Sequence, residues 1–270
     1  MDKLSAVIIT YYPDIEYVNN FVSKISSCVD NIVIVDNTGD GDLDFVTSKN
    51  SCVITNNINE GIAYAQNQGI IKSLQLNSEF IFIFDQDSDV EPDFFIKMLS
   101  SYKKNSYRKI SCLGPNYEEE LKNGISKEDF VIASGSMYSS DTFKRVGLFD
   151  SSYFIDLVDV EWCYRAKKYG LYPYVDKSIS MNHNIGNNNY PTLFGKVVRI
   201  GPPIRQYFLV RNWVFSLKSS SFSFKRKVEI IILMITKVPL FLLCAPHTKR
   251  ISCVFRGFFH GFINKVGSGS

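Results

Sequence analysis

The chain has 270 residues, of which 45% are hydrophobic and 21% are charged, and its formal net charge is +3. This composition excludes an intrinsically disordered protein, and the small net charge gives no indication of nucleic-acid binding. The six cysteines include no Cys-x-x-Cys pair, which favours reduced thiols in a cytosolic protein over a disulfide framework or a zinc site. The first apolar run is too short for a signal peptide, and residues 267–270 are interpreted as a cloning remnant.

The first third of the chain alternates between short apolar runs and helical patterns. Apolar runs at residues 6–10, 32–35, 52–55 and 80–84 predict buried strands, and apolar residues at helical spacing follow Asp14 and Gly61. This alternation predicts an α/β protein with a parallel, doubly wound sheet, whose ligand binds above the carboxyl ends of the strands. Four polar residues fall at those ends: Thr10, Asp36, Asn59 and Asp85.

The fourth predicted strand runs into Asp85-Gln86-Asp87-Ser88-Asp89, which places three acids at alternate positions. Carboxylates beside a hydroxyl suit a hard divalent cation that keeps much of its water, and such a cation can hold a diphosphate. An isolated Asp-x-Asp is more often a solvated acidic turn, so the motif needs support from the rest of the chain. No G-x-G-x-x-G follows the first strand and no G-x-x-x-x-G-K-[ST] occurs, which disfavours a dehydrogenase-type dinucleotide fold and a P-loop.

Single positions near this crevice have an ordinary structural interpretation as well as a ligand-binding one. Asp36 could accept a hydrogen bond from a ribose hydroxyl or a base N–H, or Asp36-Asn37 could form a simple Asx turn. Asn59-x-Gly61 could open a helix near a phosphate or merely cap that helix. The small residues 133–136 would let the backbone approach a ligand closely.

Beyond residue 90, the pattern predicts helices at 93–101, 140–146, 154–165 and 203–213, and a strand at 110–113 that stops at Gly114-Pro115. Residues 228–243 are strongly apolar, interrupted by Lys237 and Pro239, and flanked by basic clusters. Because this run is short and broken for a transmembrane span, we expect an interfacial amphipathic segment on an anionic membrane surface. A helix packed on the domain, or on a second copy of the chain, is the alternative.

Six motifs occur in order along the chain. They are Val7-Ile8-Ile9-Thr10-Tyr11-Tyr12-Pro13, Val35-Asp36-Asn37, Asn59-x-Gly61, Phe84-Asp85-Gln86-Asp87-Ser88, Gly147-Leu148-Phe149-Asp150 and Phe154-Ile155-Asp156-x-x-Asp159-x-Glu161-Trp162-Cys163-x-Arg165. Together they resemble the family 2 glycosyltransferases of the GT-A fold, over residues 6–218. The Asp-Gln-Asp-Ser and Phe-Ile-Asp versions resemble the bacterial rhamnosyltransferases of polysaccharide assembly.

The resemblance implies an inverting, metal-dependent transferase that moves L-rhamnose from dTDP-rhamnose to a lipid-linked oligosaccharide in O-antigen or capsule synthesis. It also implies a cytoplasmic protein, peripheral at the inner face of the bacterial cytoplasmic membrane, and leaves a homodimer open. A UDP-hexose or UDP-galactofuranose donor is the alternative within this class. A sugar-nucleotidyltransferase is the alternative from another class, but Tyr11-Tyr12-Pro13 does not supply the Gly-rich basic loop expected of it. A non-catalytic binding module is disfavoured because metal and base candidates are both present.

For the metal, the resemblance implies Asp87 as the direct ligand, with Asp85 on the ribose or in the second shell. It implies His183 as the residue that returns to the metal from the far side, although a lone histidine is more often structural. Oxygen ligands favour Mg²⁺ or Mn²⁺, and a histidine tilts the choice slightly to Mn²⁺.

For the catalytic base, the family pattern Glu-Asp-x-Asp implies Asp159, although Val158 stands where the glutamate would be. Asp156, one helical turn earlier, is the second candidate. Arg165 is expected to organise the catalytic site, but Glu161 and Arg165 stand at i,i+4 and could simply form an ion pair.

The resemblance divides the chain into a GT-A nucleotide-sugar-binding and catalytic domain at 1–200 and a helical, membrane-associating region at 201–266. The remaining site assignments fall into two groups. The nucleotide-sugar-binding group is Thr10, Tyr11, Pro13, Asp36, Asn37, Asn59, Gly61, Asp85, Gln86 and Ser136, and the acceptor or phosphate group is Glu161, Trp162, Arg205 and Arg211. Trp162 could pack on a sugar or in the core.

Overall fold

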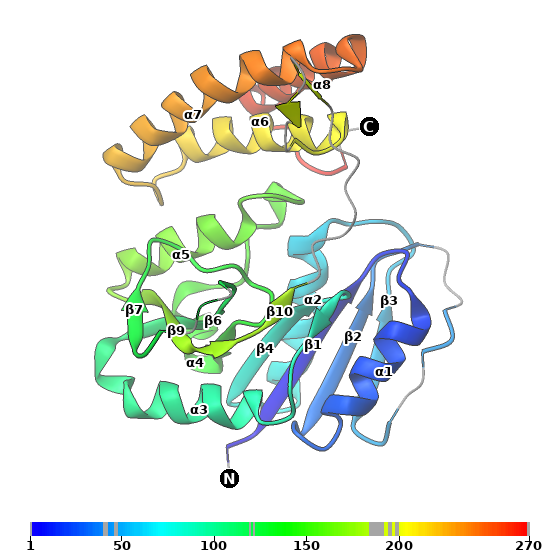
Figure 1. Ribbon diagram of the computed structural model, residues 1–270, viewed down its shortest axis with the longest axis vertical. Helices are drawn as coiled ribbons and strands as arrows, with labels where there is room; N and C mark the ends of the chain where they lie inside the picture. Colours follow the sequence, from blue (N-terminus) through cyan, green and yellow to red (C-terminus); the bar gives the residue numbers. More distant parts are fainter. Residues whose placement is uncertain are drawn as a thin grey trace.

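The computed structural model describes residues 2–39, 43–45, 48–118, 120, 122–183, 192–193, 196–197 and 200–268, and of residues 182–199 it describes backbone only. An eight-stranded sheet lies at the centre, in the order β3-β2-β1-β4-β8-β6-β9-β7 (Figure 1). The strands are β1 (Leu4–Thr10), β2 (Asn31–Asp36), β3 (Ser51–Thr55), β4 (Phe80–Asp85), β6 (Ile110–Asn116), β7 (Ile125–Lys127), β8 (Met137–Ser139) and β9 (Tyr172–Ser180).

The sheet is mostly parallel, as the alternation of elements predicts. β2 pairs with β1 and β3, β4 pairs with β1, and β9 pairs with β6, all in parallel. Only β7 and β8 among these eight strands run antiparallel to their neighbours. All seven residues of β1 are buried, because helices cover both faces of the sheet.

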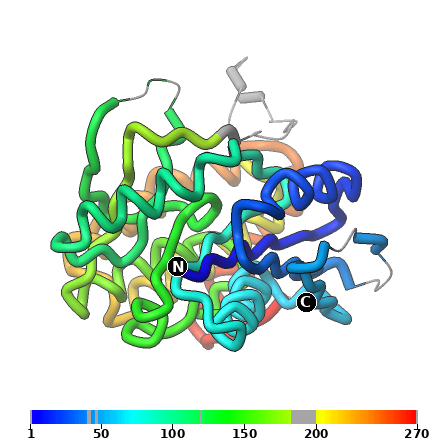
Figure 2. The backbone as a smooth tube through the Cα atoms, turned by 90° about the horizontal axis from the view of Figure 1, so that it is seen from below, coloured from blue at the N-terminus to red at the C-terminus, as the bar shows by residue number. Residues whose placement is uncertain are grey.

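Alternate residues of each central strand supply the two sides of the core. One side packs Ile8 and Phe82 against α1 (Ile15–Ile25) and α3 (Phe94–Lys104). The other side packs Val7 and Ile81 against α2 (Ile62–Gln75), α4 (Ser140–Val146) and α5 (Val158–Lys168). The expected α/β architecture with helices on both faces is therefore confirmed. In Figure 2 the N-terminal part of the chain (blue) lies on the right and the part coloured green lies on the left.

Two boundaries differ from the sequence expectation. β6 continues through Gly114-Pro115, which is tolerated because β8 pairs with β6 only at Leu113 and leaves the proline without a β8 partner. The helix expected from residue 154 begins only at Val158, because Phe154, Asp156 and Leu157 all have positive φ angles of 55° to 67°. A right-handed helix cannot include residues in that conformation.

Three C-terminal helices stack above the sheet domain (Figure 1). They are α6 (Pro203–Lys218), α7 (Phe224–Leu243) and α8 (His247–Phe262), and α7 runs unbroken through Pro239. They share a hydrophobic cluster with Val160 and Tyr164 of α5, which joins them to the sheet domain. None of the described helices combines the length and apolar content needed to cross a membrane.

α8 packs closely on α6 because two glycines face that helix. A Cβ atom on Gly257 would lie 2.7 Å from the carbonyl oxygen of Tyr207, and one on Gly261 would lie 2.7 Å from Cβ of Val214. We expect Gly257→Leu to force α8 away from α6 and to lower the free energy of unfolding by about 1–3 kcal/mol.

Ser252→Leu is the matched control, since it adds the same side chain to an exposed position of α8. Thermal unfolding of both variants measures the effect. Equal melting temperatures would show that the close approach of α6 and α8 contributes nothing to stability.

Candidate functional site

A cavity of about 300 Å³ lies at the carboxyl ends of β1 and β4, where the sequence places the ligand crevice. We call it the strand-end cavity. It gathers residues from five separate segments that lie at strand ends or before helices. Its lining is Ile9, Thr10, Tyr11, Asn37, Asn59, Gly61, Ile62, Asp85, Gln86, Asp87, Phe154 and Ile155. Most of the positions assigned to nucleotide-sugar binding therefore lie together, with Asp87 beside them.

Asp36 is buried at the end of β2, next to this cavity. Its Oδ1 accepts hydrogen bonds from Thr10 Oγ1 at 3.0 Å and from Thr38 Oγ1 at 2.7 Å. Its Oδ2 is also buried and has no hydrogen-bond partner among the described residues. A buried carboxylate oxygen without a donor costs free energy, so Asp36 is poised to accept an N–H or O–H from a ligand.

An asparagine network fixes the loops that follow β2 and β3. Asn37 Nδ2 donates to Asn59 Oδ1 at 2.9 Å, and Asn56 Nδ2 donates to Asn37 Oδ1 at 3.0 Å. Asn59 Oδ1 also accepts the Gly61 backbone N–H. These bonds hold the cavity wall in one arrangement without a ligand.

Two backbone N–H groups at the start of α2 already have partners within the protein. The Gly61 N–H is bonded to Asn59, and the Ile62 N–H donates to the carbonyl of Phe154 at 2.7 Å. Gly61 itself is required, because a Cβ there would lie 2.6 Å from the Phe154 ring and its φ is +88°. The glycine thus allows the segment at Phe154 to pack on α2.

The acids after β4 have different surroundings. The Asp85 N–H donates to the hydroxyls of Ser88 and Ser134, each at 3.1 Å, which holds the turn. The half-buried Asp87 carboxylate has no hydrogen-bond or ion-pair partner in the described part of the chain. Asp89 instead pairs with Lys24 at 2.9 Å.

Two carboxylates on one cavity wall supply the hard oxygen donors that Mg²⁺ and Mn²⁺ prefer, so the residues fit such an ion. The backbone of His183, in β10 (Asn182–His183), pairs with Ser88 of β5 (Ser88–Asp89), one residue from Asp87. The His183 side chain lies outside the described residues. Among the side chains that are described, no three His, Cys, Asp or Glu groups gather as a metal cage.

Asp159, the first-choice base, is half buried in the first turn of α5. Burial raises the pKa of its carboxyl to about 6, although hydrogen bonds from backbone N–H groups, including that of Val160 at 2.8 Å, act in the opposite direction. Burial, and then the charges of Asp85 and Asp159, also raise the pKa of Tyr117 well above its usual value. The Tyr117 hydroxyl is therefore influenced by the charges of Asp85 and Asp159.

Asp156, the second candidate, is engaged elsewhere. Arg205 donates to both of its carboxylate oxygens, from Nε at 2.9 Å and from Nη2 at 2.5 Å. Arg205 therefore engages both oxygens of the Asp156 carboxylate, whereas Asp159 has no ion-pair partner among the described residues.

Residues 153–157, between the cavity and α5, include three residues with positive φ angles and are held by side chains of α6. Asn212 Nδ2 donates to the carbonyls of Tyr153, Ile155 and Asp156 at 2.7–2.8 Å. The fully buried Arg211 donates to the carbonyls of Ser152 and Tyr153 at 3.0 and 3.2 Å. Arg211, assigned to phosphate or acceptor, thus uses its guanidinium inside the protein.

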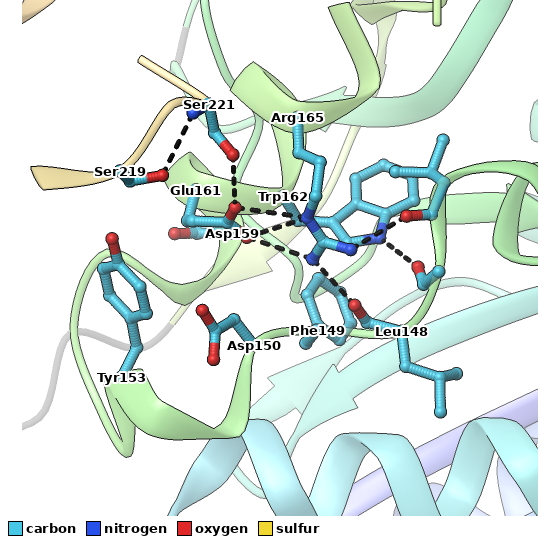
Figure 3. Close-up of polar contacts among 12 residues, drawn as sticks. Leu148, Phe149, Asp150, Tyr153, Asp159, Glu161, Trp162, Arg165, Ser219 and Ser221 are labelled. Atoms are coloured by element: carbon cyan, nitrogen blue, oxygen red, sulfur yellow. Dashed lines mark hydrogen bonds and ion pairs between the residues drawn. The ribbon is translucent and has the colours of Figure 1, made fainter. Parts of the chain in front are cut away.

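Glu161, Trp162 and Arg165 also make internal contacts (Figure 3). Arg165 binds the Glu161 carboxylate and the carbonyls of Val146 and Leu148. Trp162 is completely buried, and its indole N–H donates to the carbonyl of Gly147 at 2.8 Å. These residues hold the turn at 146–148 against α5, so their action on a substrate would be indirect.

Three residues of the nucleotide-sugar-binding group do not line the cavity: Asp36, which lies next to it, Pro13 and Ser136. The Ser136 hydroxyl is buried and donates to the carbonyl of Ile132, and Pro13 precedes Asp14, the cap of α1. Conversely, Phe154 and Ile155 line the cavity although their apolar side chains predict core positions. Their signal in the sequence is only their place five and four residues before Asp159, the first acid of α5.

A family model described as "Glycosyl transferase family 2" matches residues 5–155. A relative, dTDP-rhamnosyl transferase RfbF of Shigella flexneri, is 33% identical over 243 residues, which cover 81% of each chain. Another, the low-salt glycan biosynthesis hexosyltransferase Agl10 of Haloferax volcanii, is 22% identical over 99% of this chain and 93% of its own.

Solved structures give the fold. The fold is similar to that of TarS of S. aureus, residues 1–349, with a TM-score of 0.54, 12% identity, and coverage of 96% of this chain and 80% of that one. It is also similar to that of GalNAc-T7 with UDP, GalNAc and Mn²⁺, with a TM-score of 0.56, 13% identity, and coverage of 88% of this chain but only 58% of that one. With the family model over more than half of its length, the chain belongs to glycosyl transferase family 2 and is a GT-A glycosyltransferase.

Proposed function

We propose that this glycosyltransferase moves L-rhamnose from dTDP-rhamnose to a lipid-linked oligosaccharide in cell-surface polysaccharide synthesis, with inversion at the anomeric carbon. The observation that carries the proposal is a cavity lined by Asp85 and Asp87 together with a separate carboxylate, Asp159, whose pKa is raised to about 6. The similarity to the dTDP-rhamnosyl transferase of Shigella flexneri supports the choice of sugar.

The strand-end cavity is proposed to hold the nucleotide. Thymine and uracil both carry an N–H that the unpartnered Asp36 Oδ2 could accept, whereas the matching ring nitrogen of cytosine carries no hydrogen. Thr10 and the asparagine network hold Asp36 and Asn37 in place for this contact. Because uracil satisfies Asp36 as well as thymine does, a UDP-hexose or UDP-galactofuranose is the second candidate donor.

The diphosphate is proposed to lie at Asp87, with a divalent cation held there by Asp87 and His183. When bound, Mg²⁺ or Mn²⁺ neutralises the negative charge of the departing diphosphate. Asp85, two residues before Asp87, is proposed to contact the ribose or the water around the cation. The unpartnered state of the Asp87 carboxylate among the described residues supports this assignment.

Asp159 is proposed to accept the proton of the acceptor hydroxyl. As that oxygen forms its bond to the anomeric carbon, the bond from this carbon to the diphosphate breaks, and the configuration inverts. The proton passes to Asp159, whose raised pKa makes it a better acceptor than an ordinary aspartate. Arg165 and Glu161 are proposed to act indirectly, by fixing the position of α5. Arg205 is the candidate for direct contact with the acceptor.

Residues 201–266 are proposed to be a membrane-associating region that follows the catalytic region at 1–200. From 224 to 266 the chain has eight Lys and Arg against one acid. Large apolar side chains are exposed on both outer helices, with Ile235 68% exposed on α7 and Phe255 66% exposed on α8. Exposed apolar residues among cations fit the surface of an anionic leaflet.

A panel of nucleotide sugars tests the donor and the cation together. We expect hydrolysis of dTDP-rhamnose with Mg²⁺ or Mn²⁺ to exceed hydrolysis of UDP-hexoses and UDP-galactofuranose at least tenfold. Chelation, or Asp87→Asn, should remove both hydrolysis and tight dTDP binding by calorimetry, because the diphosphate loses its counter-charge. Asp89→Asn, two residues away and paired with Lys24, is the matched control. Full activity in excess chelator would exclude the cation.

Asp159→Asn keeps the side-chain shape and removes the basicity. Transfer should fall by about 10²–10⁴-fold while donor affinity stays unchanged. In the wild type, transfer should decline as the pH falls through about 6, because Asp159 must be ionised to act.

Stability gives a second measurement for the same variant. The raised pKa means that ionised Asp159 destabilises the folded state above pH 6, and that this cost is absent below the unfolded pKa of about 3.9. Asp159→Asn should therefore increase the free energy of unfolding above pH 6 by on the order of 1–3 kcal/mol. Asp156→Asn is the comparison; if it alone abolished transfer, the base would lie one turn earlier.

Co-sedimentation with vesicles tests the membrane proposal. The protein should bind anionic vesicles and not neutral ones, and Ile235→Glu with Phe255→Glu should release it. Ile96→Glu on α3, where Ile96 is 69% exposed, is the control for adding a charge elsewhere. Unchanged binding in the double variant, or a stable dimer that the double variant dissociates, would assign the apolar face to another partner.

A further inference from the structure

A second cavity, of about 400 Å³, lies between α6 and α7 and is separate from the strand-end cavity. We call it the helical cavity. Its walls are mainly apolar, and its lining also includes two cations, one acid and one amide. The lining residues are Asp156, Ile200, Gly201, Pro202, Arg205, Gln206, Leu209, Trp213, Leu233, Lys237 and Phe241.

Each helix contributes a stripe with one cation and two apolar side chains. On α6 the stripe is Arg205, Leu209 and Trp213, and on α7 it is Leu233, Lys237 and Phe241. Residues spaced by four lie on one face of a helix, so the two stripes form facing walls of the cavity. The Trp213 and Phe241 rings stack at 6.3 Å with an angle of 7° between their planes.

The polar groups of the helical cavity have unused hydrogen-bonding capacity. Gln206 is only 2% exposed, yet its Oε1 has no hydrogen-bond partner among the described residues. A buried amide oxygen without a donor costs free energy, so Gln206 Oε1 is available to accept an O–H or N–H group. Lys237 makes no hydrogen bond or ion pair within the described part of the chain, and Arg205 has only Asp156 as its partner.

We propose that the helical cavity binds the phosphate end of a single-chain isoprenoid-type lipid, the carrier of the acceptor sugar. Lys237 and Arg205 would hold the phosphate, the apolar walls would hold the first part of the chain, and Gln206 Oε1 would accept a sugar hydroxyl. The assignment of this lipid as the acceptor rests on the proposed transferase function. Asp156 belongs both to this lining and to the segment that leads into Asp159, which connects the lipid site to the base.

The cavity has room for a phosphate and the first part of one chain. At roughly 30 Å³ for each water-sized group, 400 Å³ holds about a dozen groups, enough for a phosphate and one or two isoprene units. The remaining chain could follow α7, whose exposed Ile231 and Ile232 are apolar. The site and the proposed membrane surface would then be continuous.

Intrinsic fluorescence provides the test, because the chain has only two tryptophans and Trp213 lines the cavity. Farnesyl phosphate, in vesicle-free buffer, should change the emission saturably, and Trp213→Phe should remove the change while buried Trp162 remains. Lys237→Gln should weaken farnesyl phosphate about five- to tenfold and leave farnesol unaffected. Lys227→Gln, also on α7 but outside the cavity, should behave as wild type.

Dihexanoyl phosphatidylglycerol separates the lipid carrier from a membrane headgroup. Binding of that lipid as tight as farnesyl phosphate, or no saturable change at Trp213 with farnesyl phosphate, would overturn the inference. Hydrolysis of dTDP-rhamnose by the same wild-type preparation tests the proposed transferase function separately from the lipid site. Hydrolysis without farnesyl phosphate binding rejects only the lipid site, and farnesyl phosphate binding without hydrolysis of any nucleotide sugar rejects only the transferase proposal.

Discussion

The convergence of three backbone carbonyls on the side chain of Asn212 is the constraint on which the site depends. It holds residues 154–157, where three positive φ angles each cost on the order of 1–3 kcal/mol. This segment supplies one wall of the strand-end cavity, the Asp156 carboxylate that pairs with Arg205, and the start of the helix that carries Asp159. The C-terminal helices therefore shape the catalytic region directly, through the contacts of α6.

The sheet and its flanking helices follow from the sequence because each signal there is local. Apolar runs of strand length, a capping Asp14 and helical spacing are properties of neighbouring residues, and the structure places β1, α1, β2, β3, α2 and β4 where they indicate. The late start of α5 depends on a distant residue, Asn212, and the passage of β6 through Pro115 depends on how β8 and β9 pair with β6. Residue patterns within a segment contain no record of such partners.

The residues of the candidate site also differ in how far their positions can be predicted from the sequence. Thr10, Asn37, Asn59 and Asp85 can be placed from the sequence because a parallel sheet brings strand ends together, whatever the side chains are. The direction of a side chain on a helix is harder, since the acids and cations of α5 and α6 occupy several faces. Arg211, Glu161 and Trp162 consequently contact the protein interior, while Gln206 and Lys237, which have no motif, line a cavity.

The insertion of antiparallel β8 between β4 and β6 affects how the chain is made. β4 is an apolar strand whose outer edge is covered only when Met137–Ser139 arrives, 54 residues after the strand ends at Asp85. At ribosomal rates of roughly 5–20 residues per second, that edge waits about 3 to 11 s. An unpaired apolar edge is a template for association with other chains. During this interval, nascent chains on neighbouring ribosomes of one mRNA could associate through the unpaired edge of β4. A chaperone that covers this edge would protect the nascent chain most at this stage.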